Sequence, residues 1–380
     1  MSKSGPRVYI IRAWRNLANS ARDGEGSVQR NTAGGGGTVL TRRKRALFAG
    51  ASALIVLVFL IFVSEGVLRL AGVRPWSKKK VTTRVEPGGA FFEKNPTLGY
   101  THIPGAYTVT LADGYSFHVT HLPNTLRVTH PIETYDSTSH RDGIWIFGCS
   151  FTHGWAVDDS QTYPWLVQQD FPGCEVVNFG CSGYGTLHAL LQLREALVTR
   201  EPPKVVVLAY ASFHEGRNTF VRKRRKAVAP WNTLGPLVQP FASLDSEGRL
   251  RIAMADVEYR EFPLMRRSAL AHFIEMTYNN VEAVRTPSRR ITEAIIGEVL
   301  ALCRANGTHL VFAFIDGKPY MMDYTRKLGV PTVDISVDMS VPANTNAPHD
   351  GHPSALTHRH YAEMLKPVLG ELLASPAARP

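Results

Sequence analysis

Two polar residues far apart in the chain have the types that nucleophilic catalysis needs. Ser150 directly follows a short apolar run, residues 144–147, and a Gly-Cys pair. A small residue at the end of a strand lets the chain turn sharply and present a hydroxyl at the sheet edge. His352 could take the proton of that hydroxyl, and Asp350 could hold the tautomer of the ring. The other interpretation of Ser150 is that it caps a helix in an ordinary loop.

Such a site also needs donors for the oxyanion of the tetrahedral intermediate. The segment 178–185 reads Asn-Phe-Gly-Cys-Ser-Gly-Tyr-Gly and follows a second apolar run. Glycines in this place let a backbone N–H approach a ligand. Three loops would thus supply a nucleophile, a backbone donor and a base, in that order along the chain.

These loops lie at the ends of elements that alternate between strand and helix. Brief apolar runs predict strands, and longer periodic stretches predict helices. The strands are expected at residues 144–147, 175–179, 205–210 and 310–315, with a weaker one at 332–335, and the helices at 164–170, 187–199, 266–278, 288–306 and 355–373. This alternation predicts an α/β fold with a doubly wound parallel sheet, whose strand ends bring the three loops to one edge.

In these motifs the chain resembles the SGNH (GDSL-type) hydrolase family over roughly residues 144–373. The Gly-Cys-Ser-Phe stretch looks like the first block of the family, which implies that Ser150 is the nucleophile and that its N–H is an oxyanion donor. The segment after the second strand looks like the second block, which implies Gly183 as the next donor. The His-Pro pair at His352 looks like the last block, with His352 as the base. The resemblance implies a flavodoxin-like sheet.

The chain departs from the family where a third block usually supplies an Asn after the third strand. Residues 211–218 read Ala-Ser-Phe-His-Glu-Gly-Arg-Asn, without that motif. Ser212, His214 or Asn218 could take the place of the missing oxyanion donor. We rank His214 first because an imidazole can donate from either ring nitrogen.

A second departure concerns the group that orients the base. The family usually has an Asp three residues before the His, where this chain has His349, whereas Asp350 lies two residues before. Either Asp350 reaches the imidazole by a different loop path, or His352 works as a dyad with a backbone carbonyl. Cys149 stands where the family usually has Asp in the first block, but that residue takes no part in the chemistry.

The remaining histidines and cysteines predict neither a metal site nor a cofactor. His153 is interpreted as a loop residue and not as a second base. His358 and His360 lie two residues apart on the expected last helix, so their rings point in different directions. The four cysteines form no Cys-x-x-Cys motif and are expected to be free thiols, although Cys149 and Cys181 could approach each other on neighbouring strands.

The first 64 residues predict a basic tail and a membrane anchor. Residues 1–45 carry ten Lys/Arg against two acidic residues, so +8 of the total net charge of +11 lies in this segment. The positive net charge is therefore concentrated in a tail, which is expected to be disordered and cytoplasmic. It does not indicate a nucleic-acid-binding face on the folded part, and no nucleic-acid partner is expected. Residues 46–64 contain no charge and are long enough for about 28 Å of helix, which predicts an uncleaved transmembrane signal anchor.

The rest of the chain divides into a lead-in and a hydrolase-like domain. Residues 65–141 are expected to form a linker and β-rich segments that cover a sheet edge, and residues 142–380 the domain itself. Residues 217–262 interrupt the alternation with a basic run and three prolines, which indicates an insertion, interpreted as a lid. A long C-terminal domain is translocated largely regardless of its charge, so we place it on the extracytoplasmic side. The anchor and the segment 95–105 also resemble those of bacterial envelope members of the SGNH family, which implies a bacterial inner membrane.

Together these features predict a membrane-anchored serine esterase that hydrolyses O-acyl esters, in particular O-acetyl groups on an envelope glycan. Its covalent acyl-enzyme would form on Ser150. The same site could instead transfer the acyl group to a sugar hydroxyl. A third alternative is a non-catalytic glycan-binding scaffold on a degraded hydrolase fold, which the missing third block favours.

Overall fold

The centre of the computed structural model, which describes residues 41–78, 83–134, 143–317 and 319–376, is a five-stranded parallel sheet. Every neighbouring pair of its strands is parallel. The strands lie in the order β12 (Thr332–Asp334), β11 (His309–Asp316), β8 (Val205–Ala211), β6 (Gly143–Phe147) and β7 (Glu175–Asn178). This is the flavodoxin-like order, whose topological switch point lies between β6 and β8. The predicted doubly wound α/β fold is confirmed.

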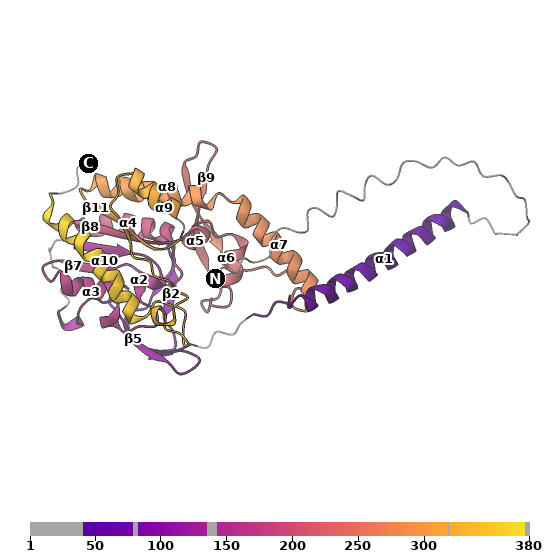
Figure 1. Cartoon of the computed structure of the whole chain (residues 1–380), viewed down its shortest axis with the longest axis horizontal. Helices are drawn as coiled ribbons and strands as arrows, with labels where there is room; N and C mark the ends of the chain where they lie inside the picture. The colour runs from indigo at the N-terminus through magenta and orange to yellow at the C-terminus, as the bar shows by residue number, and fades with distance from the viewer. Residues whose placement is uncertain (1–40, 79–82, 135–142, 318, 377–380) are drawn as a thin grey trace, which may run out of the picture. The chain divides into compact units, whose positions relative to one another are not determined.

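The sheet is buried on both faces because its strands are apolar at nearly every position, and successive side chains point to opposite faces. The covering helices are α3 (Tyr163–Asp170), α4 (Thr186–Thr199), α8 (Ser288–Ala305) and α10 (Ala355–Ala374). Trp145 and Phe147 of β6 pack in one cluster with residues of α4 and α8. Ile144 and Ile146 pack in the other cluster, with residues of α3 and α10. Figure 1 shows these helix pairs on the two sides of the sheet.

Outside residues 214–262, three of the described helices differ from the sequence prediction. α7 (Ala269–Arg285) begins and ends later than the expected 266–278, because Ser268 and Glu65 accept hydrogen bonds from its first N–H groups. α2 (Ser150–His153) and α9 (Pro319–Lys327) were not predicted. A single turn such as α2 is too short to show a helical period in the sequence.

The segment 217–262 contains regular structure that the sequence did not predict. It holds the end of α5 (His214–Thr219), then α6 (Arg222–Val228), and a hairpin in which β9 (Val238–Leu244) pairs antiparallel with β10 (Leu250–Asp256). α5 and the hairpin pack against α8 and α4, and α6 packs against α7. The segment is therefore seated on the helices of one face of the sheet.

The lead-in forms small antiparallel sheets that sit beside the main one. β1 (Arg84–Glu86), β4 (Gly105–Thr110) and β5 (Ser116–His121) form one, and β2 (Phe92–Asn95) and β3 (Gly99–His102) form the other. The chain then runs along the edge strand β7. Arg127 forms a β-bridge with Asn178, and Thr129 Oγ1 donates to the carbonyl of Val176 at 2.7 Å. The lead-in thus covers a sheet edge, as expected.

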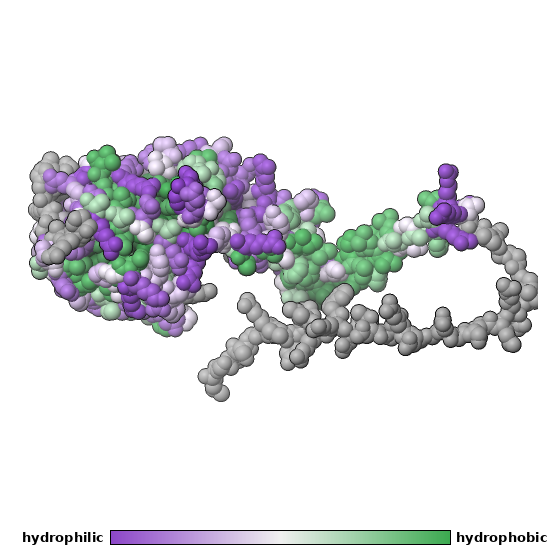
Figure 2. Space-filling view, turned by 90° about the horizontal axis from the view of Figure 1, so that it is seen from above, coloured by the Kyte–Doolittle hydropathy of each residue, from purple (hydrophilic) through white to green (hydrophobic). Residues whose placement is uncertain are grey.

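The N-terminal helix α1 (Arg42–Leu70) contains the apolar span expected at residues 46–64. No residue in its most apolar 18-residue window is buried, and Figure 2 colours most of the helix as hydrophobic. By length and composition this helix could cross a membrane. The chain divides into residues 1–60 and 61–380, and residues 1–40 of the predicted tail lie outside the described part.

Candidate active site

The structure brings Ser150, His352 and Asp350 into one hydrogen-bonded chain. Ser150 Oγ lies 3.0 Å from Nε2 of His352, and Nδ1 of the same ring bonds to the carboxylate of Asp350. Ser150 is the first residue of α2, directly after β6, and retains 5% exposure. Acyl transfer through serine requires this order of hydrogen-bonded groups: a nucleophile, a base and a carboxylate that orients the base.

A tight turn after β6 sets the position of Ser150. A Cβ on Gly148 would lie 2.0 Å from Oγ1 of Thr152, so a larger residue has no room there. The residue that follows, Cys149, is fully buried and starts the helix without a side-chain cap. The sharp strand-to-helix turn expected from the sequence is therefore present, and it places the hydroxyl above the sheet edge.

The spacing between Asp350 and His352 is accommodated by a local turn. The carboxylate Oδ1 of Asp350 accepts the backbone N–H of His352 at 2.7 Å as well as the ring N–H. A side chain that bonds to the backbone two residues later forms an Asx-turn. Asp350, not a backbone carbonyl, therefore lies beside the imidazole, which is the first of the two alternatives considered above.

The environment of Asp350 favours its ionised form. Burial by itself would raise the pKa of this carboxyl, but the hydrogen bonds and the charge of His352, together with a bond from Trp155, hold the pKa below its ordinary value. An ionised carboxylate stabilises the imidazolium that forms when the base takes a proton. The carboxylate of Asp350 is therefore suited to support His352 as a general base.

His349 has a different role from the Asp that the family usually has in its place. Its Nδ1 lies 2.6 Å from the carboxylate of Asp113, and its ring stacks on Tyr115 with a centroid distance of 4.6 Å. Both partners belong to the turn between β4 and β5. His349 thus ties the loop that carries His352 to the lead-in.

The glycine-rich loop after β7 lies beside the loop of the nucleophile. The N–H of Cys181 donates to the carbonyl of Gly148 at 3.3 Å. Gly183 has φ of +89°, and a Cβ there would lie 2.3 Å from Oη of Tyr100. Its carbonyl accepts from Arg224 at 3.0 Å. Only glycine fits this conformation and this space, and the loop leaves the same sheet edge as Ser150.

The three candidates for a further oxyanion donor have different surroundings. Ser212 Oγ donates to Asp316 at 3.2 Å. Asn218 accepts the N–H of Leu187 and donates to Thr292, so its amide holds α4, α5 and α8 together.

His214 is 1% exposed, and in the described part of the chain both of its ring nitrogens lack a hydrogen-bond partner. Burial lowers its pKa well below the ordinary value, with Arg217, His188 and Arg224 acting in the same direction. The described residues show no hydrogen bond between His214 and Ser150, so its role as an oxyanion donor stays a prediction.

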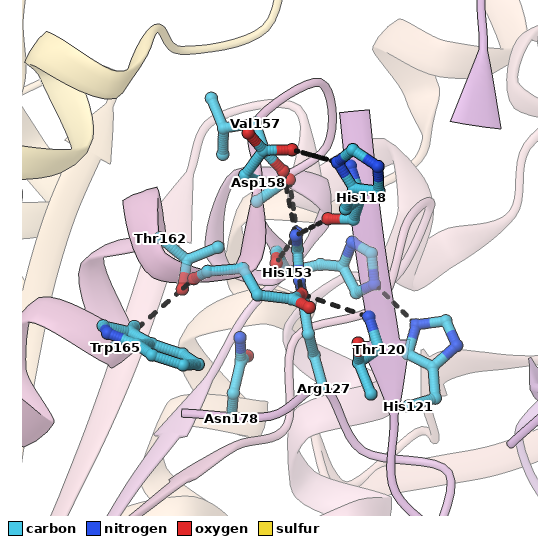
Figure 3. A network of polar contacts seen from close by, with 12 residues as sticks. His118, Thr120, His121, Arg127, His153, Val157, Asp158, Thr162, Trp165 and Asn178 are labelled. Atoms are coloured by element: carbon cyan, nitrogen blue, oxygen red, sulfur yellow. Dashed lines mark hydrogen bonds and ion pairs between the residues drawn. The ribbon is translucent and has the colours of Figure 1, made fainter. Parts of the chain in front are cut away.

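Sequence reasoning missed Arg127, which holds the segment that follows α2. This side chain is 0% exposed, and its Nε lies 2.8 Å from the carboxylate of Asp159. Its other nitrogens donate to the carbonyls of His153, Gly154, Val157 and His118. Figure 3 shows the guanidinium at the centre of this network. No periodic or motif signal marks a buried arginine in so short a segment.

The interpretation of His153 as a loop residue is wrong. His153 ends α2, is fully buried, and lies with His102 and His121. His358 is buried too, and its Nδ1 accepts the N–H of Tyr163 at 3.2 Å, which joins α10 to α3. The four cysteines are free thiols.

A cavity of about 860 Å³ lies beside Asp350, which is one of its lining residues, whereas Ser150 and His352 are not among them. Its walls come from the linker after α1, from α6 and the turn behind it, from α7, and from the loop before His352. The lining side chains include two tryptophans, two lysines and two residues of the loop before His352: Trp76, Trp231, Lys223, Lys226, His349 and Asp350. The basic segment expected as a lid thus forms one wall of the cavity beside Asp350.

Comparison with known proteins returns solved structures of hydrolases. No family model matches the chain, and no curated protein matches it. A crystal structure of TesA has 13% identity and a TM-score of 0.37, and the match covers 60% of this chain and 99% of that one. A psychrotrophic esterase, EstA from Pseudoalteromonas sp., has 12% identity and a TM-score of 0.34, with 62% and 100% covered.

A carbohydrate acetylesterase family member from Sinorhizobium meliloti has 12% identity and a TM-score of 0.35, with 62% and 100% of the chains covered. Each TM-score given is below 0.5, so these likenesses carry no argument about activity. What the site can do is inferred from its own side chains.

Proposed function

We propose that this protein is a membrane-anchored serine esterase of the SGNH type that cleaves O-acyl esters. The observation that carries the proposal is the distance of 3.0 Å between Ser150 Oγ and His352 Nε2, with Asp350 bonded to the other ring nitrogen. This geometry is already within the reach that proton transfer needs.

The proposed reaction uses these groups as follows. Ser150 Oγ attacks the ester carbonyl while His352 takes its proton, and the backbone N–H groups of Ser150 and Gly183 stabilise the oxyanion. The imidazolium then protonates the departing alcohol, which leaves an acyl group on Ser150. A water molecule, deprotonated by His352, attacks that acyl group and releases the carboxylic acid, so the serine and the neutral imidazole are restored.

The cavity beside Asp350 supports a glycan ester as substrate. Aromatic side chains such as Trp76 and Trp231 offer flat apolar surfaces, and Lys223 offers a positive charge for an anionic sugar. Lys226 is already paired with the buried carboxylate of Glu275, so Lys223 is the more available of the two cations. We therefore place an acetylated, anionic polysaccharide first among the substrates.

The anchor supports a location at a membrane surface. α1 has the length and the composition of a single-pass span, and the folded residues follow it in the chain. In the proposed orientation, the basic tail stays in the cytoplasm and the esterase acts on the outer side of a bacterial inner membrane.

The test is the hydrolysis of 4-nitrophenyl acetate by the full-length protein in detergent. Ser150→Ala is expected to lower kcat by roughly 10⁴-fold or more, since nucleophile removal has effects of this size in other serine hydrolases. Ser340→Ala, an exposed serine in the loop before the base, is the matched control and should keep wild-type turnover. Equal turnover by Ser150→Ala and the wild type would refute the proposal.

Two alternatives are decided by the same preparation. Adding a sugar acceptor and analysing the products separates hydrolysis from acyl transfer, because transfer yields an acylated sugar in place of free acid. Glycan binding without turnover of any acyl ester would instead favour the scaffold.

A further inference from the structure

Three histidines gather in the interior beneath the helix of the nucleophile. His102 ends β3, His121 ends β5 and His153 ends α2. Each ring is at most 2% exposed, and one nitrogen of each lies within 4.8 Å of those of the other two. The rings of His102 and His121 stack with a centroid distance of 4.1 Å. Three imidazoles buried in mutual contact are costly unless their nitrogens find partners.

Two of the rings are fixed by backbone carbonyls. Nδ1 of His121 lies 3.1 Å from the carbonyl of Ile103, so this nitrogen carries the proton and Nε2 carries a lone pair. His102 donates to the carbonyl of Thr125, while its buried Nε2 has no hydrogen-bond partner among the described residues. The Nε2 lone pairs of both rings therefore remain available.

The third ring completes the set. Nε2 of His153 lies 3.0 Å from Nε2 of His121, as the dashed line between the two rings in Figure 3 shows. Nδ1 of His153 is buried without a partner in the described part of the chain. One proton between His121 and His153 satisfies only that contact and leaves His102 Nε2 unpaired. A cation placed among the three rings would pair with one nitrogen of each, including His102 Nε2, and would leave only Nδ1 of His153 without a partner among the described residues.

We propose that His102, His121 and His153 bind one zinc ion. Imidazole nitrogen is a preferred zinc ligand, and histidine ligands usually donate their other ring N–H to a carbonyl or a carboxylate, as His102 and His121 do here. Tetrahedral bonds of 2.0–2.1 Å separate ligand nitrogens by about 3.4 Å. The observed 3.0 Å and the limit of 4.8 Å bracket that value, so small ring rotations are sufficient.

The charges around the cluster are compatible with a cation. Arg127 is the nearby positive side chain, and it is ion-paired with Asp159 at 2.8 Å. Three protein ligands leave the fourth zinc position for water.

The bound ion would join the lead-in to the nucleophile. His102 and His121 come from two different strands of the lead-in, whereas His153 ends the same single-turn helix that Ser150 begins. Zinc would thus fix α2 against both small sheets. Its role is positioning, and the proposal does not depend on the ester chemistry.

The experiment measures metal content in the full-length protein, purified in detergent through a tag that binds no metal. Elemental analysis is expected to find about one zinc per chain, because the three rings form one site. His102→Ala and His121→Ala should each lose the metal. His118→Ala is the control, because its exposed ring lies on the same strand β5 and pairs with Asp158 outside the cluster.

A second measurement covers the case in which the alanine variants fail to fold. Dipicolinate is added to the wild-type protein and then replaced by one equivalent of zinc. The melting temperature should fall on chelation and return on zinc addition. Cobalt in place of zinc should give the visible absorption of a tetrahedral nitrogen site. The proposal would be overturned if the wild-type protein held no zinc and its melting temperature did not rise on zinc addition. It would also be overturned if folded His102→Ala bound as much zinc as the wild type, or if the wild type held one equivalent of a different metal.

Discussion

Replacing Asp350 by Asn tests the role of the carboxylate beside the base. The substitution keeps the size of the side chain and an oxygen that can still accept the backbone N–H of His352, which lies 2.7 Å from Oδ1 in the wild type. What it removes is the negative charge next to the imidazolium that forms during attack. Two unit charges about 4 Å apart attract by about 4 kcal/mol at an effective dielectric constant of 20.

A loss of about 4 kcal/mol of transition-state stabilisation corresponds to roughly a 10³-fold fall in kcat/KM. If the new amide group turns its NH₂ toward the ring, the imidazole is held in the wrong tautomer, and the fall approaches roughly 10⁴-fold, as for the equivalent change in a serine protease triad. We therefore expect a decrease between these limits for 4-nitrophenyl acetate. KM for this small ester should change little, because the role assigned to the carboxylate is to act on the imidazole.

Asp113→Asn is the matched control. Asp113 also pairs with a histidine of the same loop, His349, at 2.6 Å, but this pair lies outside the chain of bonds to Ser150. We expect its kcat/KM to stay within about tenfold of the wild type, since a partly exposed pair contributes at most about 1 kcal/mol. Less than a tenfold decrease for Asp350→Asn, or equal decreases for the two variants, would refute the role assigned to Asp350.

Three further predictions concern stability, acidity and the substrate. Arg127→Met is expected to lower the free energy of unfolding in urea by about 3–5 kcal/mol, because it leaves Asp159 and several buried carbonyls without a donor. Arg194→Met, which removes an exposed ion pair, should lower it by at most about 1 kcal/mol. Similar losses for the two variants would contradict the role of Arg127. The pKa of Asp350 is lowered from its ordinary value of 3.8, so its pair with His352 stabilises the fold above that pH and loses this contribution as the pH falls through the lowered pKa. The stability difference between the wild type and Asp350→Asn should therefore shrink below pH 3.8, and a difference that grows there would be inconsistent with the assigned shift. Lys223→Glu should raise KM for an acetylated anionic glycan and leave 4-nitrophenyl acetate turnover unchanged; equal effects on both substrates would argue against the cavity as the glycan site.

The arrangement of the sheet and two of the site residues could be predicted because local signals mark them. The strands β6, β8 and β11 are continuous apolar runs, and polar residues at their ends must meet at one edge of a parallel sheet. Ser150 and His352 stand at such ends. The bond from Asp350 follows from the same segment once the Asx-turn is recognised.

The buried polar residues could not be predicted in this way. Arg127 lies in the segment after β5, and His102 and His121 end the strands β3 and β5, which are only a few residues long. A sequence pattern assigns a lone arginine or histidine to solvent, since burial of such groups is costly without partners. Their partners, such as Asp159 and the carbonyls after α2, are supplied by tertiary contacts. The same holds for α7, whose start is capped by Glu65 from a distant part of the chain.

The most direct test of the central claim is covalent labelling of the protein with a fluorophosphonate. The reagent phosphonylates a serine whose hydroxyl is activated by a neighbouring base, so about one label per chain is expected, carried by the peptide that contains Ser150. His352→Ala should retain the fold and label far more slowly. Absence of labelling in the folded wild-type protein, or a label on another serine, would contradict the account.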